Sequence, residues 1–339
     1  MTQQNIEQLI KQKSLPENTV SIELIETHIS WIIMCDSFVY KIKKPIQYSF
    51  LNFSSLNKRK FYCEREVELN KRLTENVYLD VQPVKYNINK IFIGNGAGKI
   101  IDYAVRMHKL PAEKRMDNLL LADGVSAADI KQLAEKISRF HKETQVIYQR
   151  QIADMKILFN DLNSQKDFLK SHLFCSSLIE NAIEASDTFL NKNEHLFKER
   201  MDNGFVRDCH GDLHSRNIFL LPEPQPFDCI EFNDALRQID VLNEIAFLCM
   251  DLDAFGRQDL SNLFLENYNR LFPSIQTEKD KMLFVYYKAY RANIRAKINS
   301  LRAVSASDAG KKKKAFDEVY KYLILMNDYI EIIIRSKMS

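Results

Sequence analysis

A short polar segment, residues 209–221, combines several side chains that can do chemistry. It reads CHGDLHSRNIFLL, so that His210, Asp212, His214 and Asn217 precede an abruptly apolar run. A carboxylate can orient and deprotonate a hydroxyl group, and an amide oxygen a few residues later can hold a metal ion. The alternative is a polar loop that only caps buried strands.

The spacing of these residues is specific. His210, Asp212 and Asn217 follow H-x-D-x-x-x-x-N, the pattern of the protein kinase catalytic loop. HGDLHSRN resembles more closely the HGDLHxxN form of aminoglycoside phosphotransferases, choline kinases and related small-molecule kinases. The resemblance implies that Asp212 is the base or acceptor-orienting group, Asn217 a metal ligand in the catalytic loop, and His210 a structural member of that loop. It also implies ATP, or another nucleoside triphosphate, and Mg as cofactors.

A second metal-binding acid is expected after the loop, where protein kinases have the aspartate of D-F-G. Glu231 in DCIEF holds that position, although the resembling enzymes usually have aspartate there. Asp228 and Asp234 stay as alternatives if the register differs. Further on, RQIDVLNEIA resembles the G-D-P-x-x-D-L-A segment, in which Asp240 would brace the catalytic loop. Asp240 could equally just begin a helix.

The stretch VYKIKKP offers lysines that could grip a phosphate. A kinase places such a lysine on a strand and pairs it with a glutamate on the following helix. Side chains alternate along a strand, so Lys41 and Lys43 share one face. We expect Lys41, with Lys43 second, to pair with Glu66. Glu64 and Glu68 on the same helix are competitors.

The rest of a nucleotide site is less plain. No glycine precedes Gly94, so the glycine-rich kinase loop is missing, and Thr27 and Ser30 in THIS would have to meet the phosphates. GNGAGK at 94–99 does not fit the Walker A spacing and predicts a hairpin turn. By resemblance, IIDYAVRMHKLP is the connection between lobes, where Met107 and His108 would offer backbone groups to adenine.

Strands dominate the first third of the chain and helices the remainder. Residues 19–43 predict a small antiparallel sheet with a turn at Asp36-Ser37, preceded by a short helix, NIEQLIKQ. A helix is expected from about Ser54, followed by strands in VQPVKYN, KIFIG and KIIDYAVRM. A capping box at Ser126 and Asp129 begins the next helix. NIFLL and FDCIEF predict a hairpin within the helical part.

This order of elements and the kinase-like motifs predict an α+β fold. It would be two-lobed and protein kinase-like, of the aminoglycoside phosphotransferase/choline kinase type. The N-terminal lobe, residues 1–110, would be a small antiparallel β-sheet that binds nucleotide. The larger, mainly helical C-terminal lobe, residues 111–339, would carry the catalytic loop and the acceptor site.

The composition is that of a soluble globular protein, with 45% apolar and 27% charged residues in 339. The 48 basic and 45 acidic side chains give a charge of +3, which does not favour nucleic acid or an anionic membrane. No stretch approaches the ~18 apolar residues of a membrane span. Six dispersed cysteines and the polar start MTQQNIEQ predict reduced thiols in a cytoplasmic protein. No obligatory protein partner is indicated.

Several segments together resemble an uncharacterised bacterial family of aminoglycoside phosphotransferase-like proteins. They are VYKIKKP, CEREVELNKRL, YAVRM, CHGDLHxxNI, DCIEFN and YRANIRAK. Many members of that family also carry a P-loop ATPase domain. The sequence would then be the kinase-like half without the ATPase half.

The phosphate acceptor is suggested only by KMLFVYYKAYRANIRAKINSLR. Lys288, Arg291, Arg295 and Arg302 recur there at helical spacing. A basic stripe near the cleft would favour an anionic acceptor, such as a sugar phosphate, a nucleotide or an RNA end. Arg291 and Arg295 are the candidate acceptor ligands. A solvated helix face explains the same pattern.

Three functions remain open. The first is an ATP- and Mg-dependent phosphotransferase that acts on a hydroxyl of a small molecule. The second is a kinase that acts on protein or RNA. The third is a pseudokinase that binds nucleotide without turnover, which the presence of Lys41, Glu66, Asp212, Asn217 and Glu231 disfavours.

Overall fold

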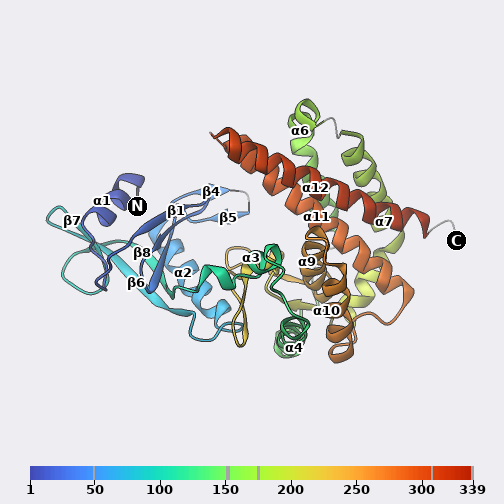
Figure 1. Ribbon diagram of the computed structural model, residues 1–339, viewed down its shortest axis with the longest axis horizontal. Coiled ribbons are helices and arrows are strands. Elements are labelled where there is room, and N and C mark those ends of the chain that lie inside the picture. The colour runs from blue at the N-terminus through green and yellow to red at the C-terminus, as the bar shows by residue number, and fades with distance from the viewer. Residues whose placement is uncertain (49, 150–152, 174–175, 307, 337–339) are drawn as a thin grey trace. The chain divides into compact units, whose positions relative to one another are not determined.

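The computed structural model describes residues 1–48, 50–149, 153–173, 176–306 and 308–336 (Figure 1). The chain forms two compact units. The first comprises residues 1–119 and 216–237, and the second comprises residues 120–215 and 238–339. A functional division near residue 110 remains a prediction. The segment that follows the HGD motif therefore belongs to the first unit, although most of the chain around it belongs to the second.

An antiparallel sheet forms the centre of the first unit, with strand order β1-β2-β3-β8-β6-β7. These strands are β1 (Glu23–Glu26), β2 (Ser30–Met34), β3 (Phe38–Lys43), β6 (Tyr78–Asn87), β7 (Lys90–Ile93) and β8 (Lys99–His108), and β4 (Gln47–Tyr48) pairs with β5 (Leu51–Asn52) beside them. The predicted turn at Asp36-Ser37 is confirmed, because β2 and β3 pair directly across it.

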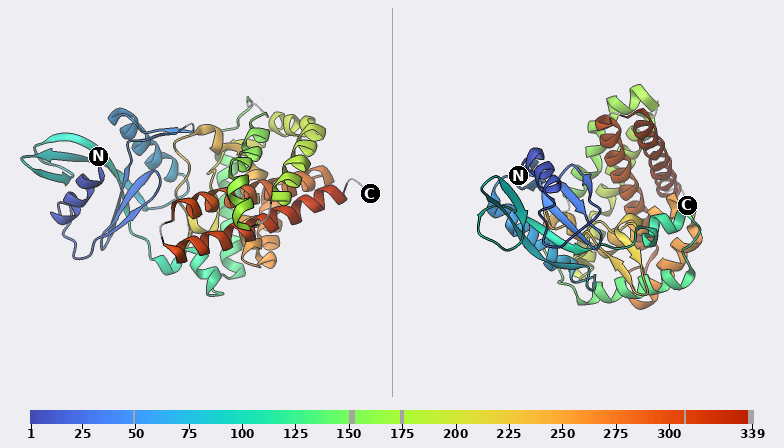
Figure 2. Two further views of the ribbon diagram at one scale, coloured as in Figure 1. Left: turned by 90° about the horizontal axis from the view of Figure 1, so that it is seen from above. Right: turned by 60° about the vertical axis from the view of Figure 1, so that its left-hand side comes forward.

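Two helices cover the two faces of this sheet (Figures 1 and 2). Helix α1 (Gln3–Lys11) buries Ile6 and Leu9 in one core with Tyr40 and Ile42 of β3. Helix α2 (Leu56–Asn70) lies on the opposite face, where Cys63 and Val67 join a second core. The side chains of β3 alternate between these faces, so Lys41 and Lys43 point to the α2 side.

The glycine-rich segment 94–98 is not a hairpin turn, and that prediction was wrong. It joins β7 to β8, but β6 lies between these two strands in the sheet. The hairpin is formed by β6 and β7 through Ile88 and Asn89, whose φ angles of 38° and 61° are left-handed. A two-residue hairpin turn favours positive φ at both central positions.

The predicted hairpin after the HGD motif exists, but its second strand comes earlier than expected. Strand β10 (Ile218–Leu220) pairs with β11 (Pro224–Pro226), and FDCIEF is irregular. Asp228 has a φ of 63°, which is incompatible with a strand. The backbone N–H groups of Asp228 and Cys229 donate to Tyr78 Oη and Asn70 Oδ1 instead of to a neighbouring strand. Helix α8 (Asp234–Arg237) ends this segment.

Helices dominate the second unit. They are α4 (Ala127–Glu143), α5 (Ala153–Asn160), α6 (Lys166–Leu173), α7 (Ser176–Asp202), α9 (Val241–Ala254), α10 (Gln258–Leu271), α11 (Glu278–Ser305) and α12 (Ala309–Arg335). The sequence boundary between the units, after residue 119, falls within α3 (Met116–Leu121). The capping box of Ser126 and Asp129 is confirmed at the start of α4. Strands β9 (Val206–Asp208) and β12 (Gln238–Asp240) form a small antiparallel pair, and 3-10 turns occupy Ala112–Lys114, Asp161–Gln165 and Ser215–Asn217.

Helix α11 packs against both α9 and α12, and α12 runs alongside it (Figure 1). Helix α9 is buried from Val241 to Asp253, so its few polar side chains must find partners inside the unit. In the part of the chain that the structure describes, no helix has the length and apolar character needed to cross a membrane. The five cysteines in that part are buried free thiols, and Cys175 lies outside it.

Candidate active site

Lys41, Lys43 and Glu66 meet on the α2 face of the sheet. Lys41 Nζ lies 2.8 Å from Glu66 Oε1, and Lys43 Nζ lies 2.6 Å from Glu66 Oε2. All three residues are buried. The competing glutamates Glu64 and Glu68 are exposed and pair with basic neighbours on α2 itself. The structure therefore brings together both predicted lysines and the predicted glutamate.

Two further carboxylates complete this cluster from the segment after β11. Lys41 Nζ lies 2.6 Å from Asp228 Oδ1, and Lys43 Nζ bonds to Glu231. Asp234, the other alternative for a metal ligand, is exposed and pairs with Arg237 at 2.6 Å. The cluster thus holds two lysines and three carboxylates, contributed by β3, α2 and residues 228–231.

The charges of this cluster depend on one another. Burial would raise the pKa of Glu66, but Lys41 and Lys43 outweigh it and hold the pKa at about 2. Burial would likewise lower the pKa of both lysines, and the carboxylates around them raise it instead. For Glu231, burial exceeds the attraction of Lys43, so its pKa is raised. A cation bound beside Glu231 would therefore favour the ionised form of this carboxylate.

The oxygen donors in this unit suit a hard divalent cation. Mg²⁺ prefers carboxylate and amide oxygens in proteins. The first unit contributes the carboxylates of Asp228 and Glu231 and contains Asn217, whose backbone oxygen accepts from Phe227 N at 2.9 Å. No sulfur or imidazole ligand is needed, so the chemistry of the set fits magnesium.

The loop around Asp212 belongs to the second unit and is held by Glu244 of α9. Glu244 Oε1 accepts from His210 N at 2.6 Å, and Oε2 accepts from Gly211 N at 3.0 Å. Gly211 has a φ of 89°, which a residue with a Cβ rarely adopts. Burial raises the pKa of Glu244 to about 7, against the opposing effect of Arg291. Glu244 thus has the bracing role that the sequence suggested for Asp240.

Asp240 has a different function in the structure. It accepts two hydrogen bonds from Arg200, at 2.6 and 2.9 Å, and one from Leu242 N at the start of α9. It therefore begins the helix, which was the alternative interpretation.

Asp212 lies among basic side chains. Its carboxylate is about one third exposed, with Oδ2 3.5 Å from His214 Nε2. Its backbone N–H donates to His210 Nδ1 at 3.2 Å, so that His210 is bonded within the loop. Burial would raise the pKa of Asp212, but His214, His210 and Arg295 together hold it well below its ordinary value. Asp212 is therefore ionised at neutral pH.

A second carboxylate of α9 holds the other end of the loop. Asp251 Oδ2 accepts from Ser215 N at 2.9 Å and from Ser215 Oγ at 2.5 Å, and Oδ1 accepts from Tyr322 Oη of α12 at 3.0 Å. Glu244 and Asp251 are seven residues apart, so they share one face of the helix. Between them Phe247 meets the His214 ring edge-on at 5.1 Å.

The expected basic stripe on α11 is not a solvated face. Arg291 and Arg295 are buried, because α9 and α12 cover this helix. Arg291 donates from Nε to Asn243 Oδ1 at 2.7 Å and from Nη1 to Gly211 O at 3.1 Å. Lys288 Nζ lies 2.5 Å from Asp253 Oδ2, and Arg302 is exposed.

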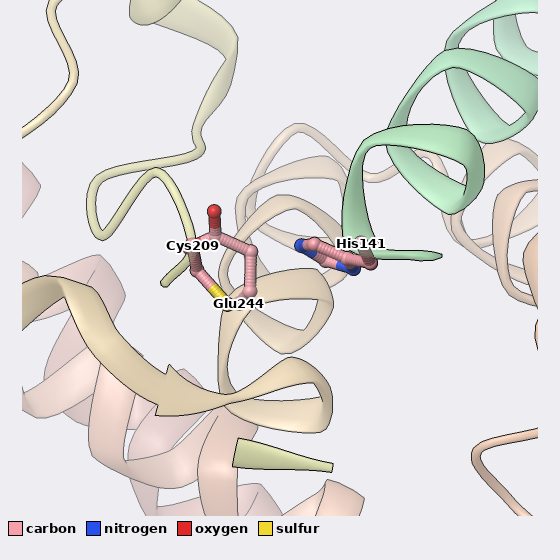
Figure 3. Close-up of side chains that lie close together, drawn as sticks. All are labelled: His141, Cys209 and Glu244. Carbon is pink, nitrogen blue, oxygen red and sulfur yellow. The ribbon is translucent and has the colours of Figure 1, made fainter. Parts of the chain in front are cut away.

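His141, Cys209 and Glu244 also lie close together, with one ligand-type atom of each within 4.8 Å of the others (Figure 3). Each already has a partner: His141 Nδ1 lies 2.7 Å from Tyr268 Oη, and Cys209 Sγ donates to Ile239 O at 3.5 Å. We interpret the cluster as a structural contact in which α4, the start of the loop and α9 pack together.

The sequence did not single out Glu244 and Asp251 as loop contacts. The available signal was the position of three acids, Glu244, Asp251 and Asp253, in a mainly apolar helix, VLNEIAFLCMDLDA. A buried carboxylate needs donors, and the nearest unsatisfied donors in such a fold are loop backbone N–H groups.

The remaining residues predicted to contact the nucleotide lie in the first unit, and some of their backbone groups already hydrogen-bond within the sheet or a turn. Met107 pairs with both Val39 and Tyr78, and His108 N donates to Val77 O at 2.9 Å. Thr27 Oγ1 accepts from Ser30 N at 2.9 Å within its own turn. Their roles toward a nucleotide stay predictions.

Comparison with solved structures identifies the fold. The structure of choline kinase from Cryptosporidium parvum is similar to this chain with a TM-score of 0.54 and 10% sequence identity. The match covers 97% of this chain and 96% of the choline kinase chain. A choline/ethanolamine kinase family protein from Mesorhizobium loti is similar with a TM-score of 0.51 and 11% sequence identity, and the match covers 92% of this chain and 94% of that protein. The chain has a protein kinase-like fold. A thermostable mutant of an aminoglycoside phosphotransferase shares this kinase-like fold over 97% of the chain and 98% of its own, with a TM-score of 0.50 and 9% identity.

Sequence comparison finds relatives of this chain that are themselves uncharacterised. Uncharacterised proteins from Mycobacterium bovis and Mycobacterium tuberculosis are 29% identical over 315 residues, which is 91% of the chain. The chain spans about 60% of the length of these curated relatives. No known family model matches the chain. The predicted fold class is confirmed, and the structural neighbours are small-molecule kinases.

Proposed function

We propose that the protein is a phosphotransferase that uses ATP, or another nucleoside triphosphate, and Mg to phosphorylate a hydroxyl group of a small molecule. The observation that carries this proposal is the buried cluster in which Lys41 and Lys43 share Glu66 and meet Asp228 and Glu231. Kinases need such a lysine and glutamate pair beside metal-binding acids. A structural ion-pair cluster alone would not require a loop like 210–217 in the same chain.

In this proposal each residue has one task. Glu66 fixes Lys41 so that its ammonium group binds phosphate oxygens, and Lys43 neutralises Glu231 until a cation is bound. Asn217 and Glu231, with Asp228 as a further candidate, would hold the magnesium ion, whose charge would offset the negative charge of the phosphates. The backbone near Met107 and His108 receives the base of the nucleotide.

Asp212 would act on the acceptor. Because its pKa is held low, it is a weak base, and its task is to accept a hydrogen bond from the acceptor hydroxyl and aim that oxygen at the phosphorus. The proton passes to the carboxylate as the new oxygen–phosphorus bond forms, while the bond between the γ-phosphorus and its bridging oxygen breaks and the nucleoside diphosphate leaves. His210 and Glu244 keep the loop in the required conformation.

The nucleotide half of this proposal is tested by thermal unfolding with ATP, with and without magnesium. Wild type should shift upward with MgATP, because ligand at ~100 times its dissociation constant stabilises the folded state by about 2.7 kcal/mol. Glu231→Ala should lose the magnesium-dependent part, whereas Glu64→Ala, an exposed glutamate of α2, should keep it. No shift of wild type with any nucleotide would refute a nucleotide site.

The transfer half is tested with Asp212→Ala. This variant should bind MgATP as wild type does, while transfer to a hydroxyl acceptor falls by about two to four powers of ten. Labelled phosphate that appears in protein or RNA of a cell extract would instead support a macromolecular kinase. Nucleotide binding with no transfer to any acceptor in wild type would indicate a pseudokinase.

A further inference from the structure

Arg295 of α11 is a buried cation whose hydrogen-bonding capacity is only partly used. The residue is 3% exposed, and its Nε and Nη2 atoms are buried without a hydrogen-bond partner among the described residues. A guanidinium group carries five N–H donors, and buried donors in proteins are normally satisfied by protein, water or a ligand. A partner for these donors is therefore expected.

Tyr322 hydrogen-bonds to the Arg295 side chain but leaves its Nε and Nη2 atoms without a partner among the described residues. Arg295 Cζ lies 5.3 Å from the centre of the Tyr322 ring. Asp251 is a buried acid that acts on Arg295 through its charge, and its oxygens accept from Ser215 and Tyr322. The positive charge of Arg295 reaches the catalytic loop, since it lowers the pKa of both Asp251 and Asp212.

The other basic residues on this part of α11 have partners. Arg291, one turn before Arg295, donates to Asn243 Oδ1 and to the Gly211 carbonyl, so it holds the loop. Lys288 pairs with Asp253. Of the two arginines that the sequence suggested for acceptor binding, Arg295 is therefore the one with N–H groups to offer.

We propose that Arg295 binds an oxyanion, a phosphate or a carboxylate, carried by the molecule whose hydroxyl group Asp212 orients. This inference rests on the proposed phosphotransferase function. A guanidinium group can give two parallel hydrogen bonds to such an anion, and the bond is strong where water is excluded. The acceptor class is thus a hydroxyl compound with a negative charge. A polycation such as an aminoglycoside would meet a buried like charge.

The test measures anion binding to the full chain without nucleotide. Thermal unfolding is followed against inorganic phosphate and, separately, against acetate, with sodium chloride holding the ionic strength constant. Wild type should show a saturable rise with one of the two, and which of them does so tells phosphate from carboxylate. Arg295→Gln should weaken that binding at least tenfold, as expected for loss of a charged hydrogen bond.

Arg295→Lys serves as a second variant, because it keeps the charge that Asp251 requires if Arg295→Gln does not fold. It should also bind the anion about tenfold more weakly, since it lacks the two-pronged donor. Arg302→Gln, an exposed arginine on the same helix, should bind like wild type. Lys41→Met should also leave the binding intact, which separates this anion from one at the nucleotide cluster.

Three results would overturn the inference: no saturable effect of either anion on wild type, equal binding by Arg295→Lys, or loss of binding in Lys41→Met. The first would mean that a buried water satisfies Arg295. The MgATP shift is measured on the same samples. If that shift is present and the anion effect is absent, only this inference fails; if the MgATP shift is absent, the proposed function fails.

Discussion

At the scale of single residues, the side chains of the first unit could be anticipated because they follow simple geometry. Alternation along a strand put Lys41 and Lys43 on one face, and both bond to Glu66. Burial could not be anticipated in the same way. Glu66 differs from Glu64 and Glu68 only by its direction from the helix axis, and that direction is fixed by which face of α2 meets the sheet.

Glu244 shows how burial changes a residue that resembles any other acid in the sequence. In the folded protein its pKa is raised to about 7 from an ordinary 4.5, so between these values it keeps a proton that the unfolded chain has lost. The free energy of unfolding should therefore fall as pH rises through this window, by up to ~1.4 kcal/mol per pH unit from this group.

This effect can be measured by comparing wild type with Glu244→Gln, which cannot titrate. Urea unfolding of both proteins at several pH values from 4.5 to 8 gives the difference in their free energies. We expect the advantage of wild type to decrease with rising pH up to about 7 and then to level off. A difference that is independent of pH would show that Glu244 titrates normally.

At the scale of elements, the helices and strands with a clear periodicity were predicted, and the segments without one were not. The capping box of α4 and the β2–β3 turn are confirmed. The strand expected at FDCIEF is absent because Asp228 adopts a left-handed φ, and Arg291 and Arg295 of α11 do not form a solvated face because two other helices cover them. Both outcomes depend on contacts between segments far apart in sequence.

Helix α9 holds the loop of residues 210–215 at two points, through Glu244 at one end of the loop and Asp251 at the other. We expect Asp251→Asn to weaken the bonds to Ser215, shift the loop and lower transfer about ten- to a hundredfold, because small displacements of catalytic groups are costly. Nucleotide affinity should stay within about twofold of wild type, because the proposed nucleotide site lies in the first unit.

Asp253→Asn is the matched control for this prediction. Asp253 is also buried on α9, two residues further on, but it bonds to Lys288 and Tyr329 instead of to the loop. Each variant should lose about 1–3 kcal/mol of stability. Steady-state kinetics of the two should then differ, and a similar loss of transfer in both would mean that stability alone explains the effect.

At the scale of the whole molecule, the chain leaves its first unit after residue 119 and returns to it at residues 216–237. The composition and periodicity of the sequence do not predict that residues 216–237 belong to the first unit. Asp228 and Glu231 look there like ordinary acids of a short polar segment. The resemblance to kinases suggested Glu231, but the partnership with Lys43 was found only in the structure.

Because the chain returns to the first unit, MgATP binding should slow hydrogen exchange in stretches that are far apart in the sequence. MgATP should protect amides in β3, in α2 and in residues 227–233, three stretches of which the last is far from the others in sequence. The β6–β7 hairpin around Ile88 provides an internal reference that should not change. Protection confined to α11 and α12 would contradict the assignment of the nucleotide site.

The same return has a consequence for synthesis of the protein on the ribosome. When residues 1–119 have emerged, Lys41 and Lys43 have Glu66 as their only partner among the acids of the cluster. Asp228 and Glu231 follow about a hundred residues later, after several helices of the second unit have been translated. At 5–20 residues per second, this delay is on the order of 5–20 s. During this interval Lys41 and Lys43 share a single carboxylate, that of Glu66, so the unfinished cluster carries an excess of positive charge.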